Sequence, residues 1–167
     1  FLTTVYHAED VPFVATLGMT RVKVGSGEAR ELALMRALDA TTIPRILVSL
    51  GITTSAKLTP FRKHCTRASF LRSVSRYPTP LLAAVSAVQP YLNTHMREVG
   101  WSDHCVGIDV ACAAICAGAT VIEKHVQLPH QARPCQPWEA TMGELAALRH
   151  FADEDPAQKY IGRWQGA

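Results

Sequence analysis

The sequence has few of the features that mark membrane and nucleic-acid-binding proteins. No apolar run reaches the roughly 18 to 20 residues needed to span a bilayer. The 17 Lys and Arg against 14 Asp and Glu give a net charge of only +3, and the basic residues are scattered along the chain. We therefore expect a protein that binds neither membranes nor nucleic acid.

The cysteines do not form a disulfide pattern. There are five of them, an odd number, at positions 65, 105, 112, 116 and 135, and none forms a C-x-x-C pair. This argues against the disulfide framework of a small secreted protein, so we expect a cytoplasmic location.

The composition is that of a globular protein, with 48% hydrophobic residues in 167. Hydrophobic periodicity alternates between strand-like and helix-like segments. The expected strands are residues 1–6, 21–24, 45–49, 70–75, 100–102 and 120–125. The expected helices are residues 10–17, 29–40, 55–67, 81–96, 108–117 and 141–152. Six successive βα units predict an α/β fold with a parallel sheet, in one domain over residues 1–167.

Reactive or hydrogen-bonding side chains follow nearly every expected strand. In chain order these are Lys23, Ser26, Glu28, Ser49, Ser75, Tyr77, Ser102, His104 and His125. An open parallel sheet binds its ligand at one switch point, whereas a barrel collects ligand contacts from the ends of most strands. The distribution therefore favours part of a (β/α)₈ TIM barrel, of which this chain supplies six units.

Two histidines end neighbouring apolar strands, in the sequences GWSDH and VIEKH. They are His104 and His125, and the apolar segment between them has the length of a crossover helix. Such a unit places two parallel strands side by side with their C-terminal ends on one face. Each histidine alone is well explained as a hydrogen-bonded residue at a strand end. The pair favours a divalent metal site.

Five short motifs, in order, resemble the sialic acid synthase (N-acetylneuraminate synthase) family. They are FLTT at 1–4, KVGSGE at 23–28, YPTP at 77–80, GWSDH at 100–104 and EKH at 123–125. The resemblance implies that the chain corresponds to strands three to eight of the family's catalytic barrel. The first two βα units and an antifreeze-like C-terminal domain would then lie outside it.

The resemblance implies a transferase that condenses phosphoenolpyruvate with an N-acetylmannosamine-type amino sugar to give a nonulosonic acid. It assigns phosphoenolpyruvate contacts to Lys23, Ser26, Ser49, Ser75 and Ser102. A phosphate and a carboxylate require such cations and hydroxyl donors. Tyr77 would contact the sugar, Glu28 with Lys23 would be catalytic, and His104 with His125 would hold Mn²⁺ or Mg²⁺. We also expect a homodimer.

One departure from the family bears on specificity. Family members carry an Asp that contacts the sugar in the loop after the last histidine, and Gln136 stands at that position here. Two alternatives therefore stay open. One is a degenerate barrel fragment that binds a metal and an anion without turnover, and the other is a different phosphoenolpyruvate-dependent synthase or aldolase.

Overall fold

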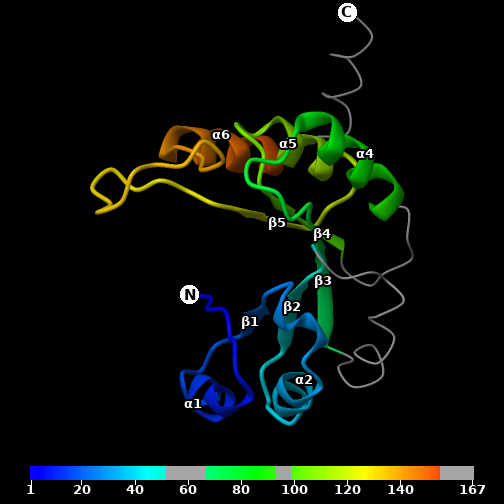
Figure 1. The fold of residues 1–167 in the computed structure, drawn as a ribbon, viewed down its shortest axis with the longest axis vertical. Coiled ribbons are helices and arrows are strands. Elements are labelled where there is room, and N and C mark those ends of the chain that lie inside the picture. Colours follow the sequence, from blue (N-terminus) through cyan, green and yellow to red (C-terminus); the bar gives the residue numbers. More distant parts are fainter. Residues whose placement is uncertain (52–66, 93–98, 155–167) are drawn as a thin grey trace, which may run out of the picture. The chain divides into compact units, whose positions relative to one another are not determined.

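The computed structural model describes residues 1–51, 67–92 and 99–154 (Figure 1). The chain forms two compact units, Phe1–Leu71 and Arg72–Ala167, and each is described by itself. The expected helix 55–67 lies, apart from its last residue, outside the described residues, as does the end of the expected helix 81–96.

The first unit is built on parallel strands. They are β1 (Arg21–Val24), β2 (Arg45–Ser49) and β3 (Ala68–Arg72). In the register Val22 pairs with Ile46, and Val48 pairs with Phe70. The expected strand 1–6 is wrong in extent, because only Thr4 forms a bridge, to Lys23. After that bridge the chain turns into a short helical segment and leaves the sheet.

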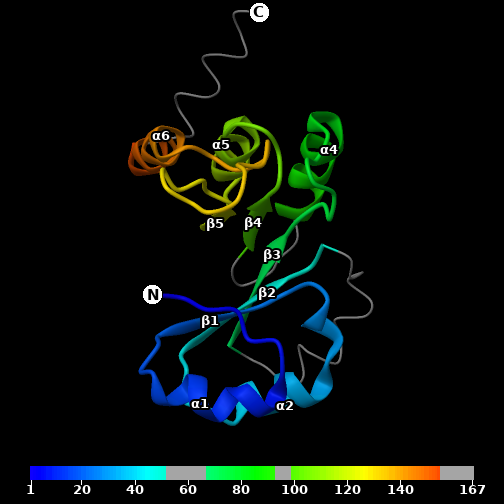
Figure 2. The same ribbon diagram turned by 60° about the vertical axis from the view of Figure 1, so that its left-hand side comes forward.

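Short helices lie on one face of β1 and β2 (Figure 2). They are η1 (Ala8–Asp10), α1 (Val11–Thr16), η2 (Glu28–Arg30) and α2 (Leu32–Asp39). The expected helix 29–40 is interrupted at Glu31, whose backbone is extended at φ −80° and ψ 96°. Gly18 ends α1 with a φ of 65°, a conformation that glycine adopts at little cost.

Side-chain alternation on β1 separates the core from the opposite face. Val22 and Val24 are fully buried, with Leu34 and Leu38 of α2 also buried. Lys23 stands between the two valines and therefore points to the other face of the sheet. Because the helices cover the face of the buried valines, the alternation places Lys23 on the face away from the helices.

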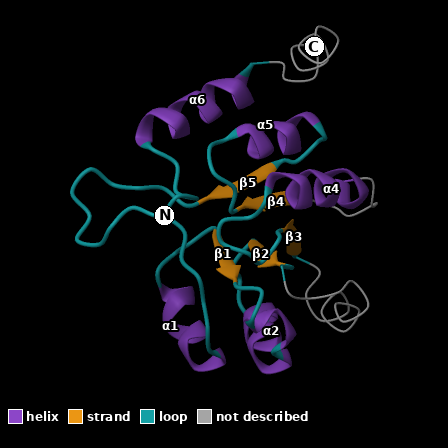
Figure 3. Ribbon diagram, turned by 45° about the horizontal axis from the view of Figure 1, so that its top comes forward, coloured by secondary structure: helices purple, strands orange, loops and turns teal. Residues whose placement is uncertain are grey.

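In the described part of the second unit, helices pack beside parallel strands (Figure 3). The strands are β4 (Val99–Asp103) and β5 (Val121–Lys124), and the helices are α4 (Leu81–Leu92), α5 (Asp109–Cys116) and α6 (Met142–Asp153). The strands are parallel, with Gly100 opposite Val121 and Asp103 opposite Lys124. This confirms the crossover unit that the two histidine motifs predicted.

The core of the second unit lies between the strands and the helices. Trp101 of β4 packs with buried side chains of α4 and α5, which are Ala84, Val88, Val110 and Ala114. On the other side of α5, Ala111 and Cys112 pack against Leu148 of α6. In the described ranges no helix has the length and apolar character needed to cross a membrane.

Candidate functional site

Alternation along β4 and β5 divides the side chains of these strands between two faces. Trp101 and Ile122 contact the helices. Ser102 lies opposite Glu123 in the register. His104 follows Ser102 by two residues, and His125 follows Glu123 by two, so all four side chains belong to the same face. The face away from the helices therefore carries two imidazoles, a hydroxyl and a carboxylate at the C-terminal ends of the strands.

The two predicted metal ligands are neighbours. The ring centroids of His104 and His125 lie 5.5 Å apart with an interplanar angle of 55°. His104 is buried, with 6% of its surface exposed, whereas His125 is exposed. Two rings this close on one face could both contribute a nitrogen to one ion.

Hydrogen bonds fix the ring of His104. Its Nδ1 lies 3.1 Å from the carbonyl oxygen of Val74, and its Nε2 lies 3.0 Å from the Tyr77 hydroxyl and 3.4 Å from that of Ser102. Burial lowers the pKa of His104, so the ring is neutral at neutral pH. Nδ1–H then donates to Val74, which leaves the Nε2 lone pair facing the site.

Tyr77 is the centre of a small aromatic group. Its ring lies 4.1 Å from that of His104, 6.0 Å from that of His125 and 5.6 Å from that of Trp138, the last two edge to face. Burial, with a smaller contribution from Glu123, raises the pKa of Tyr77. The phenol is therefore protonated and donates its hydrogen to His104 Nε2.

Trp138 is a site residue that the sequence did not predict. It belongs to the loop after β5, which returns to the strand end where the Ala140 N–H donates to the His125 carbonyl at 2.8 Å. The buried Glu139 carboxylate anchors this loop by accepting from Arg133 and from the Gln136 N–H. The loop has no hydrophobic periodicity, so only the presence of a tryptophan beside prolines could have drawn attention to it.

A buried ion pair lies behind the histidines and was also missed. Lys124 Nζ is 2.8 Å from Asp103 Oδ2, and the two side chains are 2% and 0% exposed. Each residue immediately precedes one of the two histidines in sequence. The two histidine motifs therefore already contained the ion pair, because an acidic residue precedes one histidine and a basic residue precedes the other.

The first unit carries four of the predicted residues. Lys23 and Ser49 lie on β1 and β2, and Ser26 and Glu28 follow β1. Within the described part of the chain the buried Ser49 hydroxyl oxygen has no hydrogen-bond partner. Such an oxygen is costly unless a ligand or water satisfies it.

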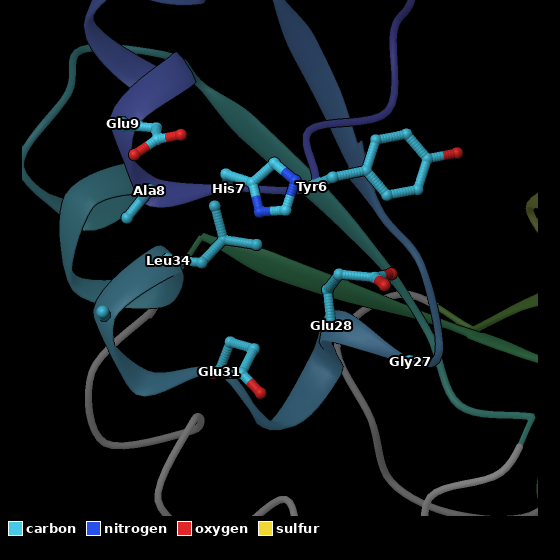
Figure 4. Close-up of a pocket in the computed structure, with 9 residues that line it drawn as sticks. Tyr6, His7, Ala8, Glu9, Gly27, Glu28, Glu31 and Leu34 are labelled. Atoms are coloured by element: carbon cyan, nitrogen blue, oxygen red, sulfur yellow. The ribbon is translucent and has the colours of Figure 1, made fainter.

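Glu28 lines a cavity of about 510 Å³ in the first unit (Figure 4). Tyr6, His7, Glu9 and Glu31 are also in its lining. The carboxylate also explains a glycine at residue 25, because a Cβ there would lie 2.4 Å from the Glu28 carboxylate oxygen.

The structure thus brings together four predicted residues of the second unit, namely Tyr77, Ser102, His104 and His125. Ser75 also belongs to this unit and is exposed.

The residues present fit a divalent metal with two protein ligands. Among the described residues no group of three or more His, Cys, Asp or Glu side chains could hold an ion. The His104 ring nonetheless shows the usual support of a ligand, with one nitrogen bonded to a carbonyl and the other directed into the site. Water and substrate oxygens would complete such a coordination sphere.

The fold matches that of a sugar acid synthase. A solved N-acetylneuraminic acid (sialic acid) synthetase from Leptospira borgpetersenii, in complex with citrate, superposes with a TM-score of 0.81 at 24% identity. The superposition covers 95% of this chain and 57% of that one. The chain therefore has the α/β fold of part of a (β/α)₈ barrel, as the sequence predicted.

The chain belongs to the NeuB family, whose sequence profile matches residues 1–150. Two Campylobacter jejuni proteins are similar to it. An N,N'-diacetyllegionaminic acid synthase is 29% identical over 77% of this chain and 40% of its own length, and a pseudaminic acid synthase is 32% identical over 74% and 37%. The chain thus spans well under half the length of these relatives.

Proposed function

We propose that the gene product containing this chain condenses phosphoenolpyruvate with an N-acylated amino sugar of the N-acetylmannosamine type to form a nonulosonic acid. The observation that carries the proposal is the pair His104 and His125 on neighbouring strand ends, with Tyr77 hydrogen-bonded to His104. Family membership and the names of the relatives, which are nonulosonic acid synthases, support this class of reaction.

The histidines have the metal-binding role in this proposal. His104 and His125 would hold Mn²⁺ or Mg²⁺, which supplies a Lewis acid for the aldehyde oxygen of the sugar. Once the metal occupies His104 Nε2, the protonated Tyr77 hydroxyl would be free to donate its hydrogen to a sugar oxygen. The Trp138 ring, which lies edge to face with that of Tyr77, would give the sugar an apolar surface to contact.

Phosphoenolpyruvate would be bound through its phosphate and carboxylate. We propose that Lys23, Ser26, Ser49, Ser75 and Ser102 provide these contacts. The position of Lys23 away from the helices and the unsatisfied buried hydroxyl of Ser49, on the adjacent strand, support the roles of these two residues. Glu28 would transfer a proton or bind the sugar, since a carboxylate accepts from both water and hydroxyl groups.

Metal binding is the direct test. In the full gene product, His104→Ala and His125→Ala should each abolish Mn²⁺ binding measured by isothermal titration calorimetry or by the electron paramagnetic resonance of free Mn²⁺. His130→Ala is the matched control, because His130 is an exposed histidine of the same unit. Unchanged Mn²⁺ affinity in both site variants would refute the metal role.

Substrate binding tests the anion site. Lys23→Ala should weaken phosphoenolpyruvate binding far more than sugar binding, and Arg21→Ala, an exposed cation on the same strand, should weaken neither. Equal losses for both substrates would show that Lys23 is structural. Turnover of phosphoenolpyruvate with N-acetylmannosamine separates a synthase from a fragment that only binds.

A homodimer and a cytoplasmic location remain proposals, which sedimentation velocity and cell fractionation test.

A further inference from the structure

We propose that the buried pair of Asp103 and Lys124 is a positioning device that sets the separation of His104 and His125. This inference rests on the metal role proposed above. The ion pair has a short Nζ to Oδ2 distance of 2.8 Å, and it joins residues that are directly opposite in the register of β4 and β5. Both side chains are almost completely removed from solvent.

Lys124 contacts the residues on both sides of His104. Its ammonium group donates to the Asp103 carboxylate and, at 2.5 Å, to the carbonyl oxygen of Cys105. Asp103 Oδ1 accepts in turn from the Cys105 N–H at 3.2 Å. His104 is thus the middle residue of a three-residue segment whose outer members both contact Lys124, the residue before His125.

The charges are unexpected in this place, because their neighbours form the apolar core. Trp101 and Cys105 belong to the cluster of buried apolar side chains, and the Trp101 indole N–H lies 3.4 Å from Asp103 Oδ1. Apolar side chains of similar volume often stabilise a core as well as a buried ion pair does. The best-attested advantage of buried polar pairs is that they specify one register.

A change of register would displace the histidines. A slip of one residue would turn every side chain of a strand to its other face. A slip of two residues keeps the faces but moves one strand by about 6.6 Å along the other. It would place Asp103 opposite Ile122 or Val126 and leave both buried charges without their partner. The ion pair therefore selects the one register in which His104 and His125 are neighbours.

The pair positions the histidines through the backbone, and this determines the test. The double variant Asp103→Leu/Lys124→Met removes both charges and so leaves no buried charge uncompensated, unlike Lys124→Met alone. Arg149→Met is the matched control, because it removes a cation from the Arg149–Asp153 pair of α6, whose side chains are 77% and 54% exposed.

Two measurements on the full gene product decide the matter. The first is Mn²⁺ affinity, and the second is the set of proton nuclear Overhauser effects between the rings of His104 and His125 in the metal-free protein. The double variant should unfold cooperatively and lose the nuclear Overhauser effects between the two rings. It should bind Mn²⁺ about tenfold or more weakly than the wild type, as variants of residues that support metal ligands do. The Arg149 variant should match the wild type in both.

The outcomes separate this inference from the proposed function. If the wild type binds no Mn²⁺, the proposed metal site is wrong, and the ring-to-ring effects alone decide whether the pair positions the histidines. If the double variant keeps both the wild-type affinity and the wild-type ring-to-ring effects, the positioning role is wrong. If the double variant does not fold, Asp103→Asn/Lys124→Met, which also removes both charges but keeps an acceptor for the Cys105 N–H, is measured in its place, and it should show the same two losses.

Discussion

At the residue scale, the Tyr77 hydroxyl is hydrogen-bonded to the His104 nitrogen that would coordinate a metal. It donates to His104 Nε2, while Nδ1 is committed to the Val74 carbonyl. Tyr77→Phe should therefore raise Mn²⁺ affinity, by about fivefold if the lost bond is worth about 1 kcal/mol. Calorimetric titration measures this change. A weaker affinity in Tyr77→Phe would mean that the hydroxyl orients His104 instead of competing with the metal.

The glycine before Ser26 makes room for a carboxylate. A methyl group at Gly25 would meet the Glu28 carboxylate oxygen at 2.4 Å, which is too close for both to stay in place. The carboxylate is the flexible end of a side chain, so Gly25→Ala should displace it with little loss of stability. If Glu28 transfers a proton, turnover should fall by about 100-fold, the low end for general acid–base catalysis.

Gly27 provides the control for this prediction. A Cβ added at Gly27 meets nothing within 4 Å, so Gly27→Ala should leave turnover close to that of the wild type. Steady-state kinetics of the two variants, beside Glu28→Gln, gives the comparison. Equal turnover in Gly25→Ala and Gly27→Ala would show that the position of Glu28 does not matter for the reaction.

At the scale of elements, the loop after β5 depends on one carboxylate. Hydrogen bonds from Arg133 and from the Gln136 N–H lower the pKa of Glu139 from 4.5 to about 2. A group whose pKa is depressed in the folded state adds stability above its unfolded value, and this stability is lost as the pH falls towards the folded value. The free-energy difference between the wild type and Glu139→Gln should therefore shrink as the pH falls from 4.5 to about 2.

Urea denaturation at a series of pH values measures this difference. Glu144→Gln is a useful companion, because Glu144 is also held by hydrogen bonds, from the Thr141 backbone N–H and hydroxyl, and its pKa is also lowered. A wild-type advantage over Glu139→Gln that stays constant across the acid range would show that the loop anchor does not depend on the charge of Glu139.

The capping box of α6 gives a prediction that is independent of the site. The Thr141 hydroxyl accepts from the Glu144 N–H at 3.1 Å, and the Thr141 N–H donates to the Glu144 carboxylate at 2.7 Å. Thr141→Ala should lower the free energy of unfolding by about 1 kcal/mol, whereas Thr141→Ser should retain most of it. Chemical denaturation distinguishes the two variants. An alanine variant as stable as the serine variant would contradict the capping role.

At the scale of the whole molecule, metal binding should appear as stability. A ligand that binds only the folded state adds about 2.7 kcal/mol at 100 times its dissociation constant. Mn²⁺ should therefore raise the thermal unfolding temperature in scanning calorimetry, and removal of the ion with a chelator should reverse the change. The double variant His104→Ala/His125→Ala should not respond. A response of equal size in that variant would place the ion elsewhere in the molecule.

The sequence was sufficient for the parts that depend on local periodicity. Apolar runs ending in His104 and His125, with a helix between them, predicted both parallel strands and the shared face. The sequence was insufficient where a single backbone angle, or a contact between residues far apart in the chain, determines the local structure. The extended residue Glu31 interrupts an otherwise helical pattern, and Trp138 reaches Tyr77 through an irregular loop.

The alternation on β5 also bears on how such a sequence can evolve. Adjacent residues of this four-residue strand serve opposite faces, since Ile122 and Lys124 lie on the side of the core, whereas Glu123 between them lies on the side of His125. Inserting or deleting one codon within the strand would therefore direct a lysine towards the site and a histidine towards the core in a single step. Substitutions can accumulate here one at a time, but changes in length are confined to the loops on either side.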